Sequence, residues 1–348
     1  MNETTIIIPA LKNSPILDNT LKQCLKLKTN PNIIIITDDI KNQTYNDKEN
    51  VEYVVVPKGM TMSKKRNIAV RKCETKYLAF FDSDSFPANQ DWLIYAIDCL
   101  KKDPKIYAVG GPDTSPPFET KSQKNVGLLK KSFLISGFRN HRKNILNEMY
   151  VPELSSCNLF MEKEKYLSLN GMDENLYTGE DTDLFNRIIA SGYKLYYSPN
   201  VHAYHYDRHF KSFLIERYDR GMQSTVAIKA YLKRIFLKND IIPGSAYTTK
   251  TFRFEFLINP LFMIYLIGLI FFLLLSKINF YYVVPLFFYI LILIVESLRI
   301  SNFTLNFINL FFKLFVCTLI QSIASLLLFF DISIDLKRYY RNVSDDYQ

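Results

Sequence analysis

The sequence predicts an α/β fold with a doubly wound, mainly parallel sheet, followed by an all-α hydrophobic region. One observation is that short apolar runs bounded by turn residues alternate with stretches of helical periodicity. Another is their order, strand then helix then strand, which is typical of parallel sheets covered by helices. The composition then changes, because from Phe256 to Phe330 the only charged residues are Lys277, Glu296, Arg299 and Lys313.

The elements of the α/β part follow in order. Buried strands are predicted at Thr5–Pro9, Asn32–Thr37, Val51–Val56, Tyr77–Phe81, around Tyr107–Gly110 and at Cys157–Met161. Helices are predicted at Ile16–Leu27, Ser63–Cys73 and Asn89–Lys101, and a further one opens at Asp181 after a Gly171-Met172-Asp173 turn. Ligands of such sheets bind at the carboxyl ends of the strands, so polar residues just past those ends are the candidate site residues.

A Pro-rich stretch, Gly111–Pro117, interrupts this alternation and predicts a loop. The segment behind it, Lys121–Asn147, is long, polar and basic, and we expect it to be mobile.

The C-terminal part predicts a membrane region. Lys211–Lys238 has the pattern of a basic amphipathic helix, which suits either a membrane interface or packing against its own domain. Three hydrophobic segments follow, at Phe256–Ser276, Ile278–Val295 and Leu314–Phe330; the first is long enough to cross a bilayer, the second nearly so, and the third is marginal. We expect three parts: a catalytic domain over 1–222, interfacial helices and linker over 223–255, and two or three spans with a short polar tail over 256–348.

Charge predicts the orientation only in part. The basic residues ahead of the first span keep the front domain cytoplasmic by the positive-inside rule. Three spans would export a tail that contains Lys337, Arg338 and Arg341, which the same rule disfavours, so the third segment either crosses despite the tail or lies in the interface.

The overall charge and the cysteines narrow the function class. The formal net charge is +9, but the basic residues are scattered and accompany no nucleic-acid-binding pattern, so an anionic membrane surface and a phosphorylated substrate explain it better. The five cysteines lack CxxC spacing, which predicts a reducing, cytosolic location and cysteines that are small buried apolar residues.

Three clusters of polar residues could perform chemistry. Asp82 and Asp84 follow an apolar strand one residue apart, so both can face one site and bind Mg²⁺ or Mn²⁺, although many loops contain such a pair. Gly179-Glu180-Asp181-Thr182-Asp183 begins a predicted helix, where acidic residues are also ordinary capping chemistry. The third cluster is His202, His205 and His209, which are either surface histidines or part of a metal site.

Taken in order, these residues resemble the inverting, GT-A-fold glycosyltransferases of family 2. The resemblance covers roughly Thr4 to Gly221. Its motifs are Ile6-Ile7-Ile8-Pro9, Ile36-Thr37-Asp38-Asp39, Lys65-Arg66-Asn67-Ile68-Ala69, Asp82-Ser83-Asp84, Asn158, Gly171-Met172-Asp173-Glu174, Gly179 to Leu184 with Arg187, Pro199, His205, and Arg217-Tyr218-Asp219-Arg220-Gly221. No single motif is decisive, but the ordered set is specific.

The resemblance implies a Rossmann-like GT-A domain and a role for each residue. The nucleotide sugar would lie against Pro9, Asp38, Asp39, Arg66, Asn67, Asp82 and Ser83. A divalent metal, Mg²⁺ or Mn²⁺, would be held by Asp82, Asp84 and His205. Asp181 would be the general base of an inverting transfer, with Glu180 and Arg187 orienting that side of the site.

Two departures from the family pattern are visible. Ile40-Lys41-Asn42 follows Asp38-Asp39 where relatives usually have a Gly-Ser turn, which leaves the nucleotide contacts there open. The Gln-x-x-Arg-Trp signature of processive synthases is absent, so we expect transfer of a single sugar. The expected acceptor is membrane-associated, either a polyprenyl phosphate or a lipid-linked glycan, and the alternative is a catalytically silent membrane protein that binds a sugar nucleotide or scaffolds partners.

Overall fold

The computed structural model describes residues 3–12, 14–39, 48–176, 179–237, 255–275 and 279–330. These residues form two compact units. The first contains Met1–Pro117 and His141–Tyr206, and the second contains Phe118–Asn140 together with the helices that follow Asp207. The Ile40-Lys41-Asn42 segment and the basic tail lie outside the described residues.

The first unit is built on an eight-stranded sheet. Its strands are β1 (Thr4–Ala10), β2 (Asn32–Thr37), β3 (Val51–Val55), β4 (Tyr77–Phe80), β6 (Ile106–Gly110), β8 (Met149–Val151), β9 (Leu159–Glu162) and β10 (Lys194–Tyr197). Their order is β3-β2-β1-β4-β9-β6-β10-β8. The first four are parallel, as are β6 and β10, whereas β9 runs antiparallel between β4 and β6 and β8 runs antiparallel at the edge. The predicted α/β class and mainly parallel sheet are confirmed.

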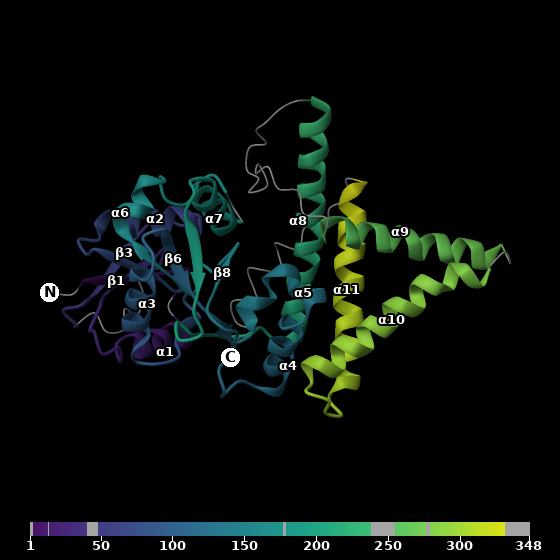
Figure 1. The fold of residues 1–348 in the computed structure, drawn as a ribbon, viewed down its shortest axis with the longest axis horizontal. Coiled ribbons are helices and arrows are strands. Elements are labelled where there is room, and N and C mark those ends of the chain that lie inside the picture. Colours follow the sequence, from purple (N-terminus) through teal and green to yellow (C-terminus); the bar gives the residue numbers. More distant parts are fainter. Residues whose placement is uncertain are drawn as a thin grey trace. The chain divides into compact units, whose positions relative to one another are not determined.

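Helices cover both faces of this sheet (Figure 1). They are α1 (Pro15–Cys24), α2 (Met62–Lys72), α3 (Trp92–Lys101), α6 (Lys163–Ser168) and α7 (Glu180–Ala190). Successive side chains of a strand point to opposite faces, so Ile6 and Ile8 pack with α1 and α3 on one face, and Ile7 packs with α2, α6 and α7 on the other. The consecutive apolar residues of β1 are therefore explained by burial on both faces.

A small second sheet brings distant segments to the edge of the large one. Its strands are β5 (Ser85–Pro87), β7 (Asp113–Thr114) and β11 (Ala203–His205), in the order β5-β11-β7. Pairing between β5 and β11 aligns Ser85 with His205, although 120 residues separate them in the sequence. Of the third predicted cluster, His205 is thereby placed next to the first cluster.

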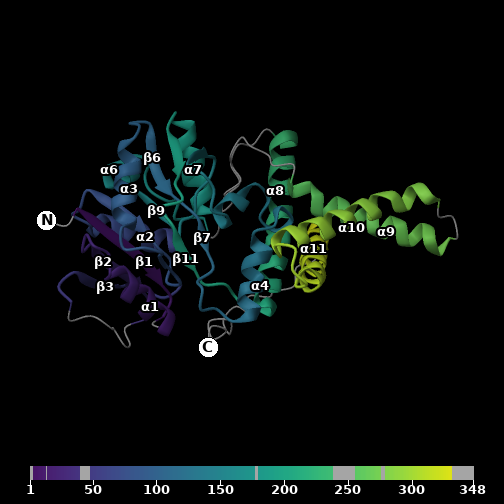
Figure 2. The same ribbon diagram turned by 60° about the horizontal axis from the view of Figure 1, so that its bottom comes forward.

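The second unit is helical. It contains α4 (Lys121–Lys130), α5 (Phe133–Ser136), α8 (Phe210–Leu237), α9 (Glu255–Leu274), α10 (Phe280–Ile300) and α11 (Phe307–Phe329). A 3₁₀ helix, Gly137–Lys143, follows α5. Helices α8 and α11 lie side by side, and α9 and α10 form a hairpin that extends away from them (Figures 1 and 2). The pattern of Lys211–Lys238 is therefore explained, at least on one face, by packing within the protein.

Two expectations need correction. The segment expected to be a mobile stretch forms α4, α5 and a 3₁₀ helix, because Thr120 and Gln123 make a reciprocal capping box and Val126 and Leu129 are fully buried. Among the described helices, α10 and α11 are long and apolar enough to cross a membrane, and the apolar stretch that is described within α9 is Pro260–Leu274. The third segment was underestimated because its helix begins at Phe307, ahead of Lys313.

Candidate active site

The carboxyl ends of three neighbouring strands form the floor of the site. The register pairs Ala10 of β1 with Thr37 of β2, so the end of β1, including the buried Pro9, lies beside the turn that contains Asp38 and Asp39. Asp82 follows β4, which pairs with β1 on its other side. The residues predicted from strand ends therefore share one edge, as expected for a parallel sheet.

Lys65 joins two of these strand ends. Its side chain is fully buried on α2, and its Nζ donates to the carbonyl oxygen of Ala10 at 2.7 Å and lies 3.4 Å from Asp38 Oδ1. Burial lowers the pKa of Lys65, and the nearby Asp38 carboxylate partly offsets this effect. Lys65 therefore fixes the position of Asp38, a role that the sequence motif did not reveal.

Arg66 is the central cation of the site. It is 2% exposed, and its NH2 lies 2.5 Å from Asp82 Oδ1 while its NH1 donates to Glu180 Oε1 at 3.1 Å. Burial opposes its charge, but Asp82 and Glu180 outweigh that effect and raise the pKa of Arg66. Arg66 thus links the carboxylate after β4 to the start of α7, which are nearly 100 residues apart in the sequence.

Two of the predicted site residues, Asn67 and Arg187, make hydrogen bonds to a turn of the backbone. Asn67 accepts hydrogen bonds from the Tyr166 hydroxyl at 2.5 Å and the Met172 N–H at 3.1 Å, and its amide donates to the Met172 carbonyl at 2.7 Å. Arg187 donates to the carbonyl oxygens of Leu169 and Gly171 and pairs with Asp183. Their placement makes both of them positioning residues for the turn at 169–172.

Ser85 fixes the backbone around the first carboxylate. Its hydroxyl accepts from the Asp82 N–H at 2.7 Å and donates to the Cys157 carbonyl at 2.9 Å. Ser83, between the two aspartates, accepts at its carbonyl from Thr20 Oγ1 at 3.1 Å. The backbone of this segment is thus fixed by hydrogen bonds at Asp82 and at Ser83.

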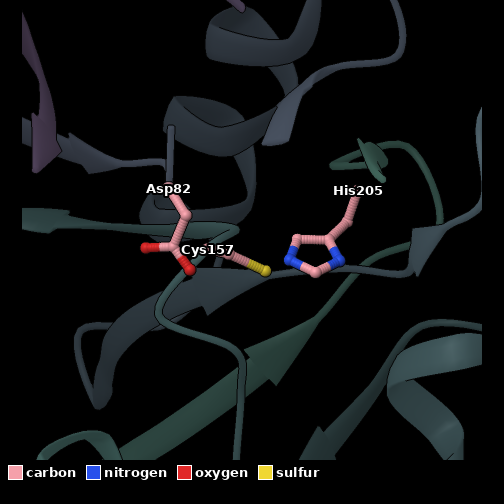
Figure 3. A group of neighbouring side chains, drawn as sticks. All are labelled: Asp82, Cys157 and His205. Atoms are coloured by element: carbon pink, nitrogen blue, oxygen red, sulfur yellow. The ribbon is translucent and has the colours of Figure 1, made fainter. Parts of the chain in front are cut away.

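Asp82, Cys157 and His205 form a compact group of donor atoms. One donor atom from each lies within 4.8 Å of the others, and the sulfur of Cys157 points toward the imidazole ring of His205 (Figure 3). His205 Nε2 lies 3.6 Å from Asp84 Oδ1. The structure therefore brings the three predicted metal ligands together and adds Cys157, which the sequence interpretation treated as a small buried apolar residue.

The position of Cys157 follows from the sheet. It lies just before β9, and because β9 runs antiparallel between β4 and β6, the start of β9 lies at the edge where β4 and β6 end. Its thiol is 4% exposed and contacts Ser155 Oγ at 3.0 Å and Asp113 Oδ2 at 3.3 Å. Burial raises the pKa of this thiol.

On the other side of Cys157, the carboxylate of Asp113 is surrounded by the basic residues Lys143 and Arg142. It is 3% exposed, its Oδ2 lies 3.0 Å from Lys143 Nζ, and Ser155 donates to it at 3.2 Å. Burial alone would raise the pKa of Asp113, but Lys143 and Arg142 reverse this and lower it to about 2. Asp113 is therefore an anion at neutral pH, close enough to His205 to interact with it.

Asp181 lies beside Arg66 and not among the clustered donor atoms. It is in the first turn of α7, which begins after Gly179 at a φ of +79°. Its charge acts on Glu180, Arg66 and Arg142. Burial and the neighbouring Asp181 raise the pKa of Glu180, although Arg66 opposes them. The two predicted acidic clusters are thus joined through one arginine.

The residues fit a divalent cation. Two ligands of a small cation at about 2.1 Å lie roughly 3–4 Å apart, a range that includes the separation of Asp84 and His205. His205 Nδ1 is buried and has no hydrogen-bond partner within the described part of the chain. Carboxylate donors such as Asp82 and Asp84 suit Mg²⁺ and Mn²⁺ alike. Burial raises the pKa of Asp82, with Arg66 acting against it, which shows how costly this carboxylate is without added positive charge.

Comparisons with known proteins bear on the family and the fold. Residues 5–163 match the family model described as glycosyl transferase family 2, and residues 144–213 match the one described as the N-terminal domain of galactosyltransferase. A search of curated proteins found no match.

Solved structures were compared separately. The mannosyltransferase PcManGT from Pyrobaculum calidifontis, solved with GDP-Man and Mn²⁺, has a TM-score of 0.60 at 13% identity, over 93% of this chain and 87% of that one. GalNAc-T7 with UDP, GalNAc and Mn²⁺ has a TM-score of 0.43 at 16% identity over 58% and 42% of the two chains. S. aureus TarS has a TM-score of 0.41 at 16% identity over 57% and 36%. The last two are too distant to support an argument.

The fold of the first unit is therefore the GT-A fold, as the sequence predicted. Within that fold, residues 5–163 are similar to glycosyl transferase family 2, and the unit is followed by a C-terminal region with two long apolar helices. The resemblance found in the sequence is confirmed.

Proposed function

We propose that this protein transfers a single sugar, with inversion, from a nucleotide-sugar donor to a membrane-associated acceptor in glycan or glycoconjugate synthesis. The observation that supports this most is the Arg66 bridge, with the donor group around Asp82 and His205 on one side and the Glu180-Asp181 pair on the other. A group transfer needs these two functions, charge compensation for a leaving diphosphate and a base for the attacking hydroxyl, on opposite sides of one reacting carbon.

Each residue has a defined part in this proposal. Asp38 and Asp39, at the end of β2, contact the base or ribose of the donor. Asp82, Asp84 and His205 would hold the divalent cation, and a bound Mn²⁺ or Mg²⁺ neutralises the charge that develops on the departing diphosphate. Asp181 accepts the proton of the acceptor hydroxyl, while Arg66 keeps Glu180 and Asp82 in place.

Two acceptor classes remain within the proposal. A lipid-linked glycan presents a neutral hydroxyl and requires Asp181 as base, whereas a polyprenyl phosphate is already anionic and depends less on a base and more on cations. The basic residues Arg142 and Lys143, which lie beside Asp113, supply positive charge on that side of the catalytic unit. We place the enzyme in the cell membrane as a multi-pass protein with its catalytic domain in the cytoplasm.

The proposal is tested by a matrix of donors and acceptors. The full chain in detergent is assayed with a panel of nucleotide sugars, each with polyprenyl phosphate or lipid-linked glycan and with Mn²⁺, Mg²⁺ or chelator. We expect one donor to be consumed only with an acceptor and a metal, and one sugar per acceptor in the product. Turnover that is undiminished by Asp181→Asn and Asp84→Ala together would reject the assigned sites.

A catalytically silent sugar-nucleotide-binding protein is the second candidate. One observation favours it, since Asp82 Oδ1 already contacts Arg66 at 2.5 Å, which partly satisfies a residue needed for the cation. Donor binding detected by calorimetry, with no turnover for any acceptor in the same matrix, would support this second function.

A further inference from the structure

Apolar composition and packing disagree about which helices cross the membrane. By length and apolar composition, α10 and α11 are the candidate membrane-spanning helices. However, 17% of the most apolar stretch of α10 is buried by protein, against 39% of that of α11. Between Lys313 and Leu328 of α11, the only exposed large apolar side chain is Ile323. More of α11 than of α10 is therefore covered by protein, and its stretch from Lys313 to Leu328 has few large apolar side chains that are fully exposed.

The two helices of the hairpin, α9 and α10, differ from α11 in their exposed surface. Large apolar side chains are exposed along most of both helices. They are Ile258, Leu261, Ile264, Ile267, Ile270, Phe271, Phe272, Leu273 and Leu274 on α9, and Phe280, Tyr281, Tyr282, Val283, Phe287, Phe288, Leu291, Ile292 and Val295 on α10. Apolar surfaces this large are rare on monomeric soluble proteins and mark sites of contact with a membrane or another protein.

The main cover of α11 is α8, which runs beside it in the same direction. Gly221 approaches so closely that a Cβ atom there would lie 2.1 Å from the Gln321 carbonyl oxygen. One turn further, Thr225 Oγ1 donates to the Ser325 carbonyl at 2.6 Å, and beyond that Lys229 Nζ donates to the Leu328 carbonyl at 2.8 Å. Because these contacts run along both helices, α8 and α11 must lie at the same depth relative to a membrane.

Helix α8 is too highly charged for the interior of a bilayer. Its first twenty residues contain Lys211, Glu216, Arg217, Asp219, Arg220 and Lys229. A charged residue at the bilayer centre costs about 2.5–3.5 kcal/mol on insertion scales, and the Arg220 side chain is 43% exposed. At the start of α11, Lys313 also contacts α8, with its Nζ 4.9 Å from the Phe210 ring. A bilayer core around α11 would therefore have to accept these charges as well.

We propose that α9 and α10 alone cross the bilayer, as a helical hairpin, and that α11 is an internal helix packed on α8 outside the hydrocarbon. Both hairpin helices run outward from the α8 and α11 pair, crosswise to it, and meet at an apex (Figures 1 and 2). At 1.5 Å per residue, the uncharged part of α9, Phe256–Leu274, extends about 28 Å, close to the thickness of the hydrocarbon core. A membrane crossed by the hairpin then lies along α11 and not across it.

The two ends of the hairpin suit the two membrane surfaces. Near the apex, Tyr281 and Tyr282 follow Phe280, the aromatic residues typical of the interface. At the other end of α10, Glu296 accepts from Ser132 Oγ at 2.7 Å and Arg299 donates to the Lys131 carbonyl at 2.9 Å, so this end is held in a polar setting.

This arrangement resolves the conflict over orientation. With two spans, the chain before α9 and the chain after α10 are on the same side. The basic residues that precede the hairpin and the basic residues of the tail are then both retained on the cytoplasmic side, as the positive-inside rule requires. With three spans they would be separated.

Single cysteines at described positions test the topology without any need for activity, so the outcome is independent of the proposed chemistry. Asn279→Cys labels the apex, Leu305→Cys the connection between α10 and α11, and Phe330→Cys the end of α11. Each is expressed in the full chain and exposed to a membrane-impermeant maleimide in intact cells and after permeabilisation. The parent chain is the control, since its five cysteines are buried.

We expect Asn279→Cys to react in intact cells, and both Leu305→Cys and Phe330→Cys to react only after permeabilisation. Reaction of Phe330→Cys in intact cells would show that α11 crosses and would overturn the proposal. Protection of Asn279→Cys until permeabilisation would equally overturn it, because the hairpin would then not reach the far side.

Discussion

Replacement of Arg66 by methionine is expected to destabilise the catalytic unit strongly. The side chain is 2% exposed and compensates two carboxylates, at 2.5 Å from Asp82 and 3.1 Å from Glu180. Removing one partner of a buried ion pair costs about 3–5 kcal/mol, because a charge is left buried without compensation. The Asp82 side chain is 34% exposed and water can reach it, so we expect the lower end of this range, about 3 kcal/mol.

The chain provides its own reporter for this experiment. Trp92 is its single tryptophan and is fully buried in the first unit, so intrinsic fluorescence in detergent follows the unfolding of that unit. A loss of about 3 kcal/mol corresponds to a decrease in Tm of roughly 6–12 °C for a domain of this size. The matched control is Arg71→Met, on the same helix, whose side chain is 57% exposed and 3.5 Å from Glu174. An exposed pair of this kind contributes about 0–1 kcal/mol, so the control should shift Tm far less.

The pH dependence gives the sign of the effect. Burial already raises the pKa of Asp82 and of Glu180, so the folded unit binds protons more tightly at these groups than the unfolded chain does. Such groups favour the fold at low pH and oppose it as the pH rises through their folded pKa. Without Arg66 this opposition grows, so the Tm difference between variant and parent should shrink as the pH falls. Equal Tm losses for Arg66→Met and Arg71→Met, or a difference that grows at low pH, would refute the reasoning.

Three further outcomes are expected. Asp181→Asn should lower transfer to a hydroxyl acceptor roughly 10²–10⁴-fold while calorimetry still detects donor binding, and loss of binding in parallel would argue against a role as base. Cys157→Ser should abolish the sulfur-to-metal charge-transfer absorbance that Co²⁺ or Cd²⁺ produces in the parent, while Cys73→Ser retains it; unchanged spectra in both would exclude Cys157 as a ligand. Burial and the neighbouring Asp207 raise the pKa of Glu119 from 4.5 to about 8, so its stabilising contribution is present at low pH and is lost as the pH rises through 8. Hydrogen-exchange protection of residues 118–132, corrected for intrinsic rates, should therefore decline between pH 5 and 8 in the parent and be flatter in Glu119→Gln.

Much of the site was predictable because its residues follow strand ends in a fixed order. The parallel pairing of β1, β2 and β4 determines that Asp38, Asp39 and Asp82 share an edge, and sequence periodicity is enough to predict that pairing. His205 could be anticipated from the ordered motifs, but its contact with Asp84 depends on pairing between β5 and β11, which have only three residues each and little sequence signal.

Other features could not be predicted from local patterns. Cys157 reaches the site only because β9 inserts antiparallel between β4 and β6, a topological fact that no spacing reveals. The role of Asn67 in holding the turn at Met172 likewise depends on a contact across more than 100 residues. The helix α4, in contrast, had a local signal in Thr120 and Gln123, a capping box at the usual spacing, that was outweighed by the polar composition of the segment.

The most direct test of the account is anomalous diffraction from crystals of the full chain soaked with Mn²⁺ and a nucleoside diphosphate. We predict one manganese peak at coordination distance from Asp84 and His205, with the diphosphate against it and the Asp181 carboxylate facing the open side across from the peak. A peak elsewhere on the protein, or a diphosphate bound away from this edge of the sheet with no metal beside His205, would contradict the proposed site.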